Sequence, residues 1–207
     1  MGRPEMGATA EHALRVRAKQ ELRKRMLSLR RVLPIEGCAA RSAAICARLC
    51  ELEAFTRATT IVGYVAFRKE ADPQAALRSA ETAGKRVGLV RVEEGGALGL
   101  HRYQSGDALS DNAYGIAEPE AGAPRIAHAE VSLVIVPALA VDARGHRIGY
   151  GQGFYDRLLP KLDAAYKVAI AYDFQLLAEL PSTEDDFAVD CVITEKRALL
   201  CERPPAP

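Results

Sequence analysis

The chain has 207 residues, which is enough for one domain with a sizeable hydrophobic core or for two small domains. Hydrophobic residues make up 49% and charged residues 27%, values typical of globular proteins, so a disordered chain, a collagen and a disulfide scaffold are excluded. The 28 Lys and Arg residues nearly balance the 27 Asp and Glu residues, which excludes a wholly basic nucleic-acid binder.

The positive charge is concentrated near the N-terminus. Residues 1–31 contain nine Lys and Arg residues against three Glu residues, an excess of +6, whereas the rest of the chain carries −5. The balanced total therefore excludes a polyanionic partner but not a small anion, and we expect such an anion to bind near the N-terminal segment.

The cysteines and the apolar runs indicate the compartment. The five cysteines are odd in number and form no CxxC pair, so they are typical of free, buried thiols rather than of a zinc ribbon or a redox pair. No apolar segment lies between the N-terminal charges, and no apolar run reaches the roughly 18–20 residues of a membrane span. We expect a cytoplasmic protein without membrane association.

The first half of the chain begins with helices. Residues 1–8 contain two Gly and one Pro and predict a disordered tail, followed by a single domain over residues 9–203. The next apolar residues recur every three or four positions and predict a helix over residues 9–33: Leu14, Ala18, Leu22, Met26 and Leu29. Arg15, Lys19 and Arg23 form a cationic stripe on this helix. A second helix is predicted over residues 35–52.

From residue 59 strands and helices alternate. Strands are predicted over residues 59–65, 86–92, 97–102, 131–137, 167–172 and 189–194, and helices over residues 72–83, 154–162 and 175–179. Residues 104–128, rich in Gly, Pro, Asn and Asp, predict a long loop. The alternation predicts an α/β fold: a single-domain, three-layer α/β/α sandwich with a mostly parallel central sheet, Rossmann-like.

A glycine-rich turn carries the clearest functional signal. Gly149, Gly151 and Gly153 alternate between a buried strand and a predicted helix, with Arg147 and Arg157 on either side. Glycine allows backbone N–H groups to approach a ligand, and a following helix adds the positive end of its dipole. The turn predicts a phosphate site, although it matches neither GxGxxG nor the P-loop, and a purely structural turn remains the alternative.

Carboxylates near the predicted strand ends are candidate metal or substrate ligands. Asp156 follows the glycines, where a carboxylate beside bound phosphates suits Mg²⁺. Four further acids could supply a second carboxylate: Glu184, Asp185, Asp186 and Asp190. Glu70 follows the first predicted strand. His146 has no evident acid/base partner and is interpreted as a loop residue.

Five segments, taken in order, give the chain a family resemblance. They are Lys19-Gln20-Glu21-Leu22-Arg23, Glu70, residues 136–142 (VPALAVD), residues 147–157 (RIGYGQGFYDR) and residues 186–190 (DFAVD). With these segments the chain resembles the 5-formyltetrahydrofolate cyclo-ligase family, also called the 5,10-methenyltetrahydrofolate synthetase family. The resemblance extends from about residue 15 to the last predicted strand.

The resemblance implies a reaction. ATP phosphorylates the formyl oxygen of 5-formyltetrahydrofolate, N10 attacks the activated carbon, and phosphate leaves as the ring closes to 5,10-methenyltetrahydrofolate. Such chemistry depends on positioning and charge neutralisation rather than on a protein nucleophile. The implied partners are the folate, ATP and Mg²⁺, with a monomeric enzyme and neither nucleic acid nor membrane.

The resemblance also implies roles for individual residues. It implies an ATP site made of Lys19, Gln20, Glu21, Leu22, Arg23, Arg147, Gly149, Tyr150, Gly151, Gln152, Gly153, Phe154 and Tyr155. It implies a folate site made of Val65, Glu70, Gln152, Gly153, Phe154 and Tyr155, in which Tyr155 and Glu70 are the catalytic residues. The implied Mg²⁺ ligands are Asp156 and Asp186.

Three positions depart from the family pattern Gly-Arg-Gly-Lys-Gly-Tyr-Tyr-Asp-Arg. Tyr150 stands in place of Arg, Gln152 in place of Lys, and Phe154 in place of the first Tyr. Loss of a charged phosphate contact costs about 1.5–3 kcal/mol, so a divergent or non-catalytic relative that binds folate or nucleotide is the main alternative. A sugar-phosphate isomerase and a nucleic-acid-binding helix are further alternatives, and the latter lacks interleaved aromatic residues.

Overall fold

Buried aliphatic runs form the centre of the fold. Among residues 5–183 and 186–201, which this computed structural model describes, a seven-stranded sheet has the order β12-β11-β9-β6-β1-β2-β3. Its strands are β1 (Thr60–Gly63), β2 (Arg86–Val92), β3 (Leu98–Arg102), β6 (Leu133–Pro137), β9 (Tyr166–Ile170), β11 (Cys191–Ile193) and β12 (Ala198–Leu200). Strands β1 and β6 are buried along nearly their whole length, as expected for strands covered on both faces.

The five inner strands are parallel. β1 pairs with β2 and with β6, and the same residue, Ile61, lies opposite Val87 on one side and Leu133 on the other. β6 continues through β9 to β11, while β3 and β12 are antiparallel edges. Numbered along the chain, the parallel strands have the order 2-1-3-4-5, so the topology reverses between β1 and β6. The predicted Rossmann-like, mostly parallel sheet is confirmed.

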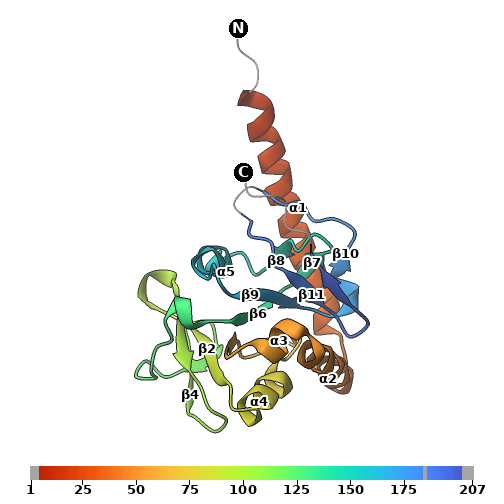
Figure 1. Ribbon diagram of the computed structural model, residues 1–207. Coiled ribbons are helices and arrows are strands. Elements are labelled where there is room, and N and C mark those ends of the chain that lie inside the picture. Colours follow the sequence, from red (N-terminus) through yellow and green to blue (C-terminus); the bar gives the residue numbers. More distant parts are fainter. Residues whose placement is uncertain (1–4, 184–185, 202–207) are drawn as a thin grey trace.

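Helices cover both faces of this sheet (Figure 1). Helices α2 (Ile35–Glu51), α3 (Glu53–Arg57) and α4 (Gln74–Thr82) pack on the face that carries Ile61, Leu133 and Ile135. The opposite face, with Val62 and Val134, is covered by α5 (Phe154–Leu158) and the short turn η3 (Leu159–Lys161). The second outer layer is therefore thin, because the helix predicted over residues 154–162 divides into these two short elements.

Two small sheets replace segments predicted otherwise. Residues 104–128, expected to be a loop, contain the ribbon β4 (Leu109–Asp111) and β5 (Ala117–Pro119). Strands β7 (Ala140–Asp142), β8 (Arg147–Ile148) and β10 (Leu176–Leu177) form a second sheet in the order β10-β7-β8. The other short turns are η1 (Glu94–Gly96), η2 (His128–Glu130) and η4 (Asp173–Gln175).

The helix predicted over residues 175–179 is wrong. Gln175 is buried, and its Nε2 donates to the carbonyl oxygens of Ala138 at 3.1 Å and Leu139 at 2.8 Å. These bonds hold the chain beside β7, where the following residues pair as β10. A long-range contact therefore overrides the local helical pattern.

Helix α1 (Glu5–Arg31) extends away from the sheet in its amino-terminal half (Figure 1). Residues 5–8, predicted to belong to a disordered tail, continue this helix, and residues 1–4 and 202–203 of the predicted segments lie outside the described residues. The apolar residues of the predicted helix differ in burial: Met26 is 3% exposed, whereas Leu14 is 65% and Leu29 41% exposed. The helix that this apolar spacing predicts is confirmed.

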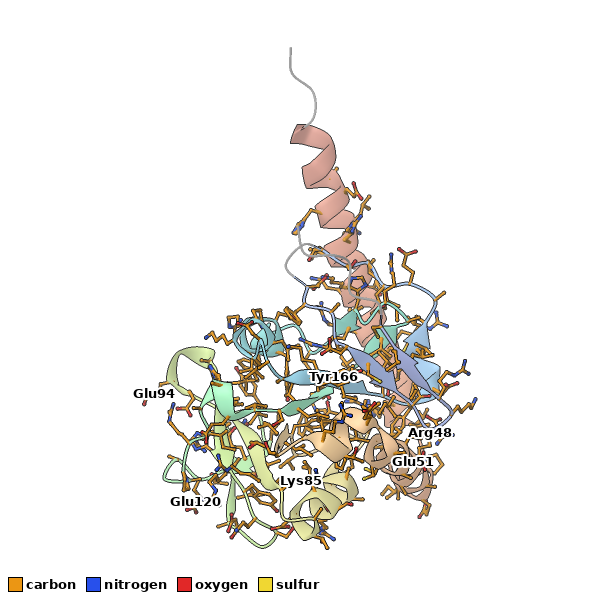
Figure 2. All side chains as sticks on the ribbon, viewed as in Figure 1. Arg48, Glu51, Lys85, Glu94, Glu120 and Tyr166 are labelled. Carbon is orange, nitrogen blue, oxygen red and sulfur yellow. The ribbon has the colours of Figure 1, made fainter. Side chains whose placement is uncertain are left out.

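The two ends of the sheet can be located in Figure 2. Glu94 marks the turn after the carboxyl end of β2, and Lys85 lies just before its amino end. The Lys85 ammonium donates to the carbonyl oxygens of Thr56 at 2.7 Å and Ala58 at 2.6 Å, which fixes the chain between α3 and β1. None of the helices in the described part of the chain is both long and apolar enough to span a bilayer.

Candidate active site

A cavity of about 340 Å³ lies where β1 and β6 end, at the point where the strand order reverses. Tyr64 and Val65, which follow β1, and residues 137–139 at the end of β6 contribute to its wall. Open parallel sheets bind ligands in this position. The other walls come from α1, the glycine turn, the β4–β5 ribbon and the segment before β11.

The glycine turn brings its backbone close to two arginines. Gly151 has φ +100° and Gly153 has φ +66°, conformations that side chains other than glycine rarely adopt. A Cβ atom at Gly151 would lie 3.4 Å from Cζ of Arg23, and one at Gly153 would lie 2.9 Å from an Arg157 nitrogen. Glycine is therefore favoured here by the backbone conformation, and the guanidinium groups lie close to that backbone.

The helix after this turn is short. α5 has five residues and begins at Phe154, directly after Gly153, so the predicted contribution of a helix dipole is small. Positive charge at the turn comes instead from side chains: Arg23, Arg147 and Arg157 all approach it.

Two cations of the α1 stripe reach the cavity. The Lys19 ammonium lies 2.5 Å from Oδ2 of Asp186 and 3.3 Å from Oγ1 of Thr183. The Arg23 Nε donates to the carbonyl oxygen of Gly149 at 3.0 Å. Lys19 is only 9% exposed, although the surrounding helix surface faces solvent. These contacts join α1 to the glycine turn and to the segment before β11.

The three residues between these cations do not line the cavity. Gln20 and Glu21 are exposed, and Glu21 accepts a bond from Lys24 at 2.9 Å. Leu22 packs against an apolar cluster that contains Met26. A helix presents only one face to the site. Of the implied residues 19–23, Lys19 and Arg23 therefore line the cavity, and the three residues between them do not.

Arg147 joins the glycine turn to Asp156. Its NH2 lies 2.8 Å from Oδ1 of Asp156, and its guanidinium lies 5.4 Å from the centre of the Tyr155 ring. Burial lowers the pKa of Arg147, an effect that the nearby Asp156, Tyr155 and Asp186 oppose. Among the described residues, neither Nε of Arg147 nor the buried hydroxyl of Tyr155 has a hydrogen-bond partner. Both are therefore free to donate to a ligand.

Glu70 is a buried carboxylate on the cavity wall. Its side chain is 5% exposed, and Oε2 accepts a bond from the backbone N–H of Phe67 at 3.0 Å. Burial raises the pKa of Glu70, while the Arg30 guanidinium, the Phe67 N–H and the Tyr150 hydroxyl lower it. A buried carboxylate with one backbone bond has lone pairs available for ligand N–H groups.

Guanidinium groups lie beside both loop positions at which the family pattern has cations. The Arg30 guanidinium lies 5.6 Å from the centre of the Tyr150 ring and donates to the Tyr150 hydroxyl. The Arg157 NH1 donates to the carbonyl oxygen of Gln152 at 2.9 Å. Positive charge is therefore present near positions 150 and 152, although it comes from α1 and α5 rather than from the loop itself.

The β4–β5 ribbon contributes a wall that the predicted loop did not reveal. Asn112, Tyr114 and Ile116 line the cavity, and the Tyr114 ring contacts the Phe154 ring edge-on with 6.0 Å between centres. Tyr114 is 49% exposed, so much of its ring is accessible. These residues were missed because a Gly- and Pro-rich segment gives no periodic signal; the isolated aromatic residue was the one available indication.

Several other polar residues serve the fold. Asp142, fully buried, accepts bonds from the backbone N–H groups of Arg144, His146 and Leu180 and from His146 Nδ1. His146 thus has a partner that the sequence did not show, but neither residue lines the cavity. Asp190 accepts the Lys167 backbone N–H at 2.8 Å, and Glu184 and Asp185 lie outside the described residues. Asp186 is the predicted second carboxylate that reaches the site.

A larger open hollow of about 900 Å³ lies at the opposite, amino end of β1 and β2. Two of the three cations that line it have partners: the Lys85 ammonium bonds two carbonyl oxygens, and Arg86 pairs with Glu130, while Arg102 is the third. The smaller cavity holds the unpartnered donors and the predicted site residues, so we assign the chemistry there.

The donor set of the small cavity fits Mg²⁺. Asp156 and Asp186 both line it, and the negative charge of each raises the pKa of Arg147. Mg²⁺ is commonly held by one or two carboxylates together with phosphate oxygens and water, so two carboxylates beside a phosphate site suffice. In the described part of the chain no group of three or more His, Cys, Asp or Glu residues is placed to hold a metal by itself.

Comparisons with known proteins identify the family of the chain. The model of the 5-formyltetrahydrofolate cyclo-ligase family matches residues 15–195. The 5-formyltetrahydrofolate cyclo-ligase of Mycolicibacterium smegmatis is 33% identical over 90% of this chain and 98% of its own length. The enzyme of that name from Escherichia coli K12 is 32% identical over 68% of this chain and 80% of its own.

Solved structures give the same result. The 5,10-methenyltetrahydrofolate synthetase of Aquifex aeolicus superposes with a TM-score of 0.79 at 31% identity, covering 91% of this chain and 95% of that one. The synthetase of Mycoplasma pneumoniae has a TM-score of 0.70 at 20% identity, covering 86% and 98%, and shows likeness of fold alone.

Proposed function

The chain belongs to the 5-formyltetrahydrofolate cyclo-ligase family, and from that premise we propose that it converts 5-formyltetrahydrofolate to 5,10-methenyltetrahydrofolate with consumption of ATP. The observation that carries this proposal is the single cavity lined both by the glycine turn with its cations and by the buried Glu70. Such a cavity holds an anion and a hydrogen-bonding ring side by side.

The proposed reaction has two steps, phosphoryl transfer and ring closure. The formyl oxygen attacks the γ-phosphorus of ATP, and ADP leaves with the bridging oxygen. N10 of the folate then forms a bond to the activated carbon and loses its proton. The carbon–oxygen bond breaks, and the phosphate departs with the former formyl oxygen. Because the protein forms no covalent intermediate, its task is to orient two substrates and to stabilise charge on the phosphoryl group.

The phosphates are proposed to lie at the glycine turn. Lys19 and Arg23 bring two positive charges from α1, and Arg147 has an unused Nε donor. Backbone N–H groups between Gly149 and Phe154 add donors that do not depend on side-chain identity. Charge-assisted bonds of this kind stabilise the transferring phosphoryl group, in which negative charge is spread over three oxygens.

Magnesium is proposed to bind at Asp156 and Asp186. When bound, the ion would neutralise charge on the phosphate oxygens. The chain's own contribution is to keep both carboxylates next to cations that fix them: Asp156 against Arg147, and Asp186 against Lys19. Each carboxylate retains oxygen lone pairs beyond those that its cation uses.

The folate is proposed to lie between Glu70 and Tyr155, with Val65 and Phe154 providing apolar contact and residues 152–153 completing the wall. Burial raises the pKa of Tyr155, so its phenol stays protonated at neutral pH and donates rather than accepts. Glu70 supplies the complementary acceptor for ring N–H groups. The two residues thus offer opposite hydrogen-bonding roles on one ligand.

We further propose a monomer that acts in the cytoplasm on small molecules, without nucleic acid or membrane. The free state of all five cysteines supports a reducing compartment. The alternative of a non-catalytic relative rests on the missing loop cations; Lys19, Arg23 and Arg147, which line the cavity, still supply positive charge there and support the catalytic function.

The proposal is tested by following the near-ultraviolet absorbance of the methenyl product. Purified protein with 5-formyltetrahydrofolate, ATP and Mg²⁺ is expected to form the product, and omission of ATP is expected to abolish it. Formation of ADP in equal amount would support coupling. No product in the complete mixture, from protein shown to be folded, would rule the function out.

A further inference from the structure

Arg30 is a fully buried cation with an unused donor. The residue lies in the last turn of α1 and is 1% exposed. Its NH1 has no hydrogen-bond partner among the described residues, and the nearest carboxylate oxygen, Oε1 of Glu70, is 3.8 Å away. Arg30 and Glu70 thus form a buried ion pair without a hydrogen bond between them, so other contacts must fix the direction of the guanidinium.

Two further contacts fix its direction. The Arg30 Nε donates to the carbonyl oxygen of Arg68 at 2.9 Å, and NH2 donates to the Tyr150 hydroxyl. The guanidinium therefore bridges the turn before Glu70 and the glycine turn. The residues that it contacts there, Arg68 and Tyr150, are 82 positions apart in the sequence.

The turn before Glu70 is strained. Arg68 has φ +49° and Lys69 has φ +58°, left-handed conformations that are uncommon outside glycine. The end of α1 holds both residues: Arg30 binds the Arg68 carbonyl, and the Lys69 ammonium donates to the carbonyl oxygens of Arg31 at 2.8 Å and Leu33 at 2.6 Å. Strain of this kind persists where several contacts hold the backbone in place, typically beside functional groups.

Arg30 is also the charged group that opposes the burial of Glu70. The ionisable side chains that face Glu70 come from every neighbouring element: Arg30 from α1, Tyr64 after β1, Tyr150 from the glycine turn and Tyr155 from α5. Tyr172, after β9, donates to the Glu70 backbone oxygen at 3.0 Å. The four tyrosines are neutral donors at ordinary pH, so the positive charge in this group belongs to Arg30.

We propose that Arg30 is a positioning residue, which acts through Tyr150 and the 67–70 turn to present Glu70 to the cavity as a charged acceptor of fixed direction. This inference rests on the proposed function, in which Glu70 receives the N–H groups of the substrate's ring. A charged, fixed acceptor selects rings that carry N–H donors at that edge, because a ring without them leaves the carboxylate unpaired. Arg30 itself does not touch the substrate.

Kinetics of Arg30→Met, with Arg31→Met as the matched control, test the proposal. Arg31 is the adjacent, exposed arginine, and no side-chain contact ties it to the cavity. Arg30→Met is expected to raise the KM for 5-formyltetrahydrofolate about tenfold or more with little change in the KM for ATP. The folate KM of this variant is expected to fall again as the pH rises from 6 to 9, since the buried Glu70 then ionises without help.

Three further variants separate positioning from folding. Arg30→Lys keeps the charge and is expected to restore most of the folate affinity and a flat pH profile. Tyr150→Phe removes the bridging hydroxyl and is expected to raise the folate KM by a smaller factor. Glu70→Gln cannot ionise and is expected to have a high folate KM at every pH. These three variants still test the role of Arg30 if Arg30→Met does not fold.

The outcome for the inference is distinct from that for the proposed function. Absence of methenyl product with the wild-type protein would refute the proposed function. The role of Arg30 can still be tested without substrate, by NMR titration of the Glu70 carboxyl carbon in the wild type, Arg30→Lys and Tyr150→Phe. A Glu70 transition at lower pH in the wild type than in Tyr150→Phe supports it. The proposal is overturned if the wild type is active and Arg30→Met has the folate KM and pH profile of the wild type. If Arg30→Met is unfolded, the same result for Tyr150→Phe overturns it.

Discussion

Lys19 and Asp186 form an ion pair with 2.5 Å between Nζ and Oδ2, although they lie 167 positions apart in the chain. The pair connects α1 to the segment before β11 at the edge of the cavity. Both side chains are largely buried, so the contact is less screened than a surface ion pair and fixes the position of the first helix relative to the site.

Lys19→Ala is expected to raise the KM for ATP by about tenfold or more, because loss of a charged hydrogen bond costs about 1.5–3 kcal/mol, and to affect the folate KM less. Lys24→Ala is the control: Lys24 lies on the same helix but pairs with exposed Glu21. Steady-state kinetics with each substrate varied measure both effects. An ATP KM that is the same in Lys19→Ala and Lys24→Ala would remove Lys19 from the nucleotide site.

Gly151→Ala is expected to lower kcat/KM for ATP strongly. A side chain at φ +100° is strained, so the backbone of the turn is expected to shift. Gly122→Ala provides the comparison, since no atom lies within 4 Å of a Cβ atom there. Unfolding by urea is expected to show a loss of about 1–2 kcal/mol in Gly151→Ala. Equal activity of the two variants would contradict the assigned role of the turn.

Asp156→Asn is expected to increase the Mg²⁺ concentration that gives half-maximal activity by about tenfold, the loss expected when a charged ligand becomes neutral. Asp163→Asn, at an exposed position away from the cavity, should leave the Mg²⁺ dependence unchanged. Titration of activity with Mg²⁺ at saturating ATP distinguishes them. An Asp156→Asn enzyme with the wild-type Mg²⁺ dependence would exclude Asp156 as a ligand.

Acid is expected to weaken the contacts of the β2–β3 turn. Glu93 accepts bonds from His101 at 2.8 Å and Arg125 at 2.7 Å, and the bond from His101 lowers the pKa of Glu93. A carboxyl whose pKa is lower in the folded than in the unfolded state stabilises the fold above about pH 4.3, and this contribution disappears as the pH falls through the folded value.

The test compares Glu93→Gln with Glu94→Gln, its exposed neighbour (Figure 2). Urea unfolding is expected to show Glu93→Gln less stable than the wild type by about 1 kcal/mol at pH 7, with a smaller difference below pH 4. Glu94→Gln should match the wild type throughout. A Glu93→Gln difference that is constant from pH 7 to pH 3 would refute the titration as its cause.

The sequence predicted those elements whose pattern agrees with their packing. β2 was predicted with its observed bounds, and β6 within two residues; the continuous apolar run of β6 is buried on both sheet faces. β4 and β5 were not predicted, since three-residue strands in a Gly- and Pro-rich segment leave no periodicity. The erroneous helix over residues 175–179 shows the same limit, because the buried amide of Gln175 is held by distant carbonyl groups.

The site shows a similar division. The glycine turn, Glu70, Asp156 and two members of the α1 stripe, Lys19 and Arg23, carry local signals and line one cavity. Arg30 was not singled out because its burial comes from Tyr150, 120 positions away. One signal was available: Arg30 lies seven residues after Arg23, so it continues the face of α1 that carries Lys19 and Arg23.

The central claim is that ATP activates the formyl oxygen in this cavity, and isotope transfer tests it most directly. The protein is supplied with 5-formyltetrahydrofolate whose formyl oxygen carries a heavy isotope, together with unlabelled ATP and water, and the released phosphate is examined by mass spectrometry. We expect one labelled oxygen in each phosphate formed. Methenyl product accompanied by unlabelled phosphate, with the label recovered in water, would contradict the mechanism.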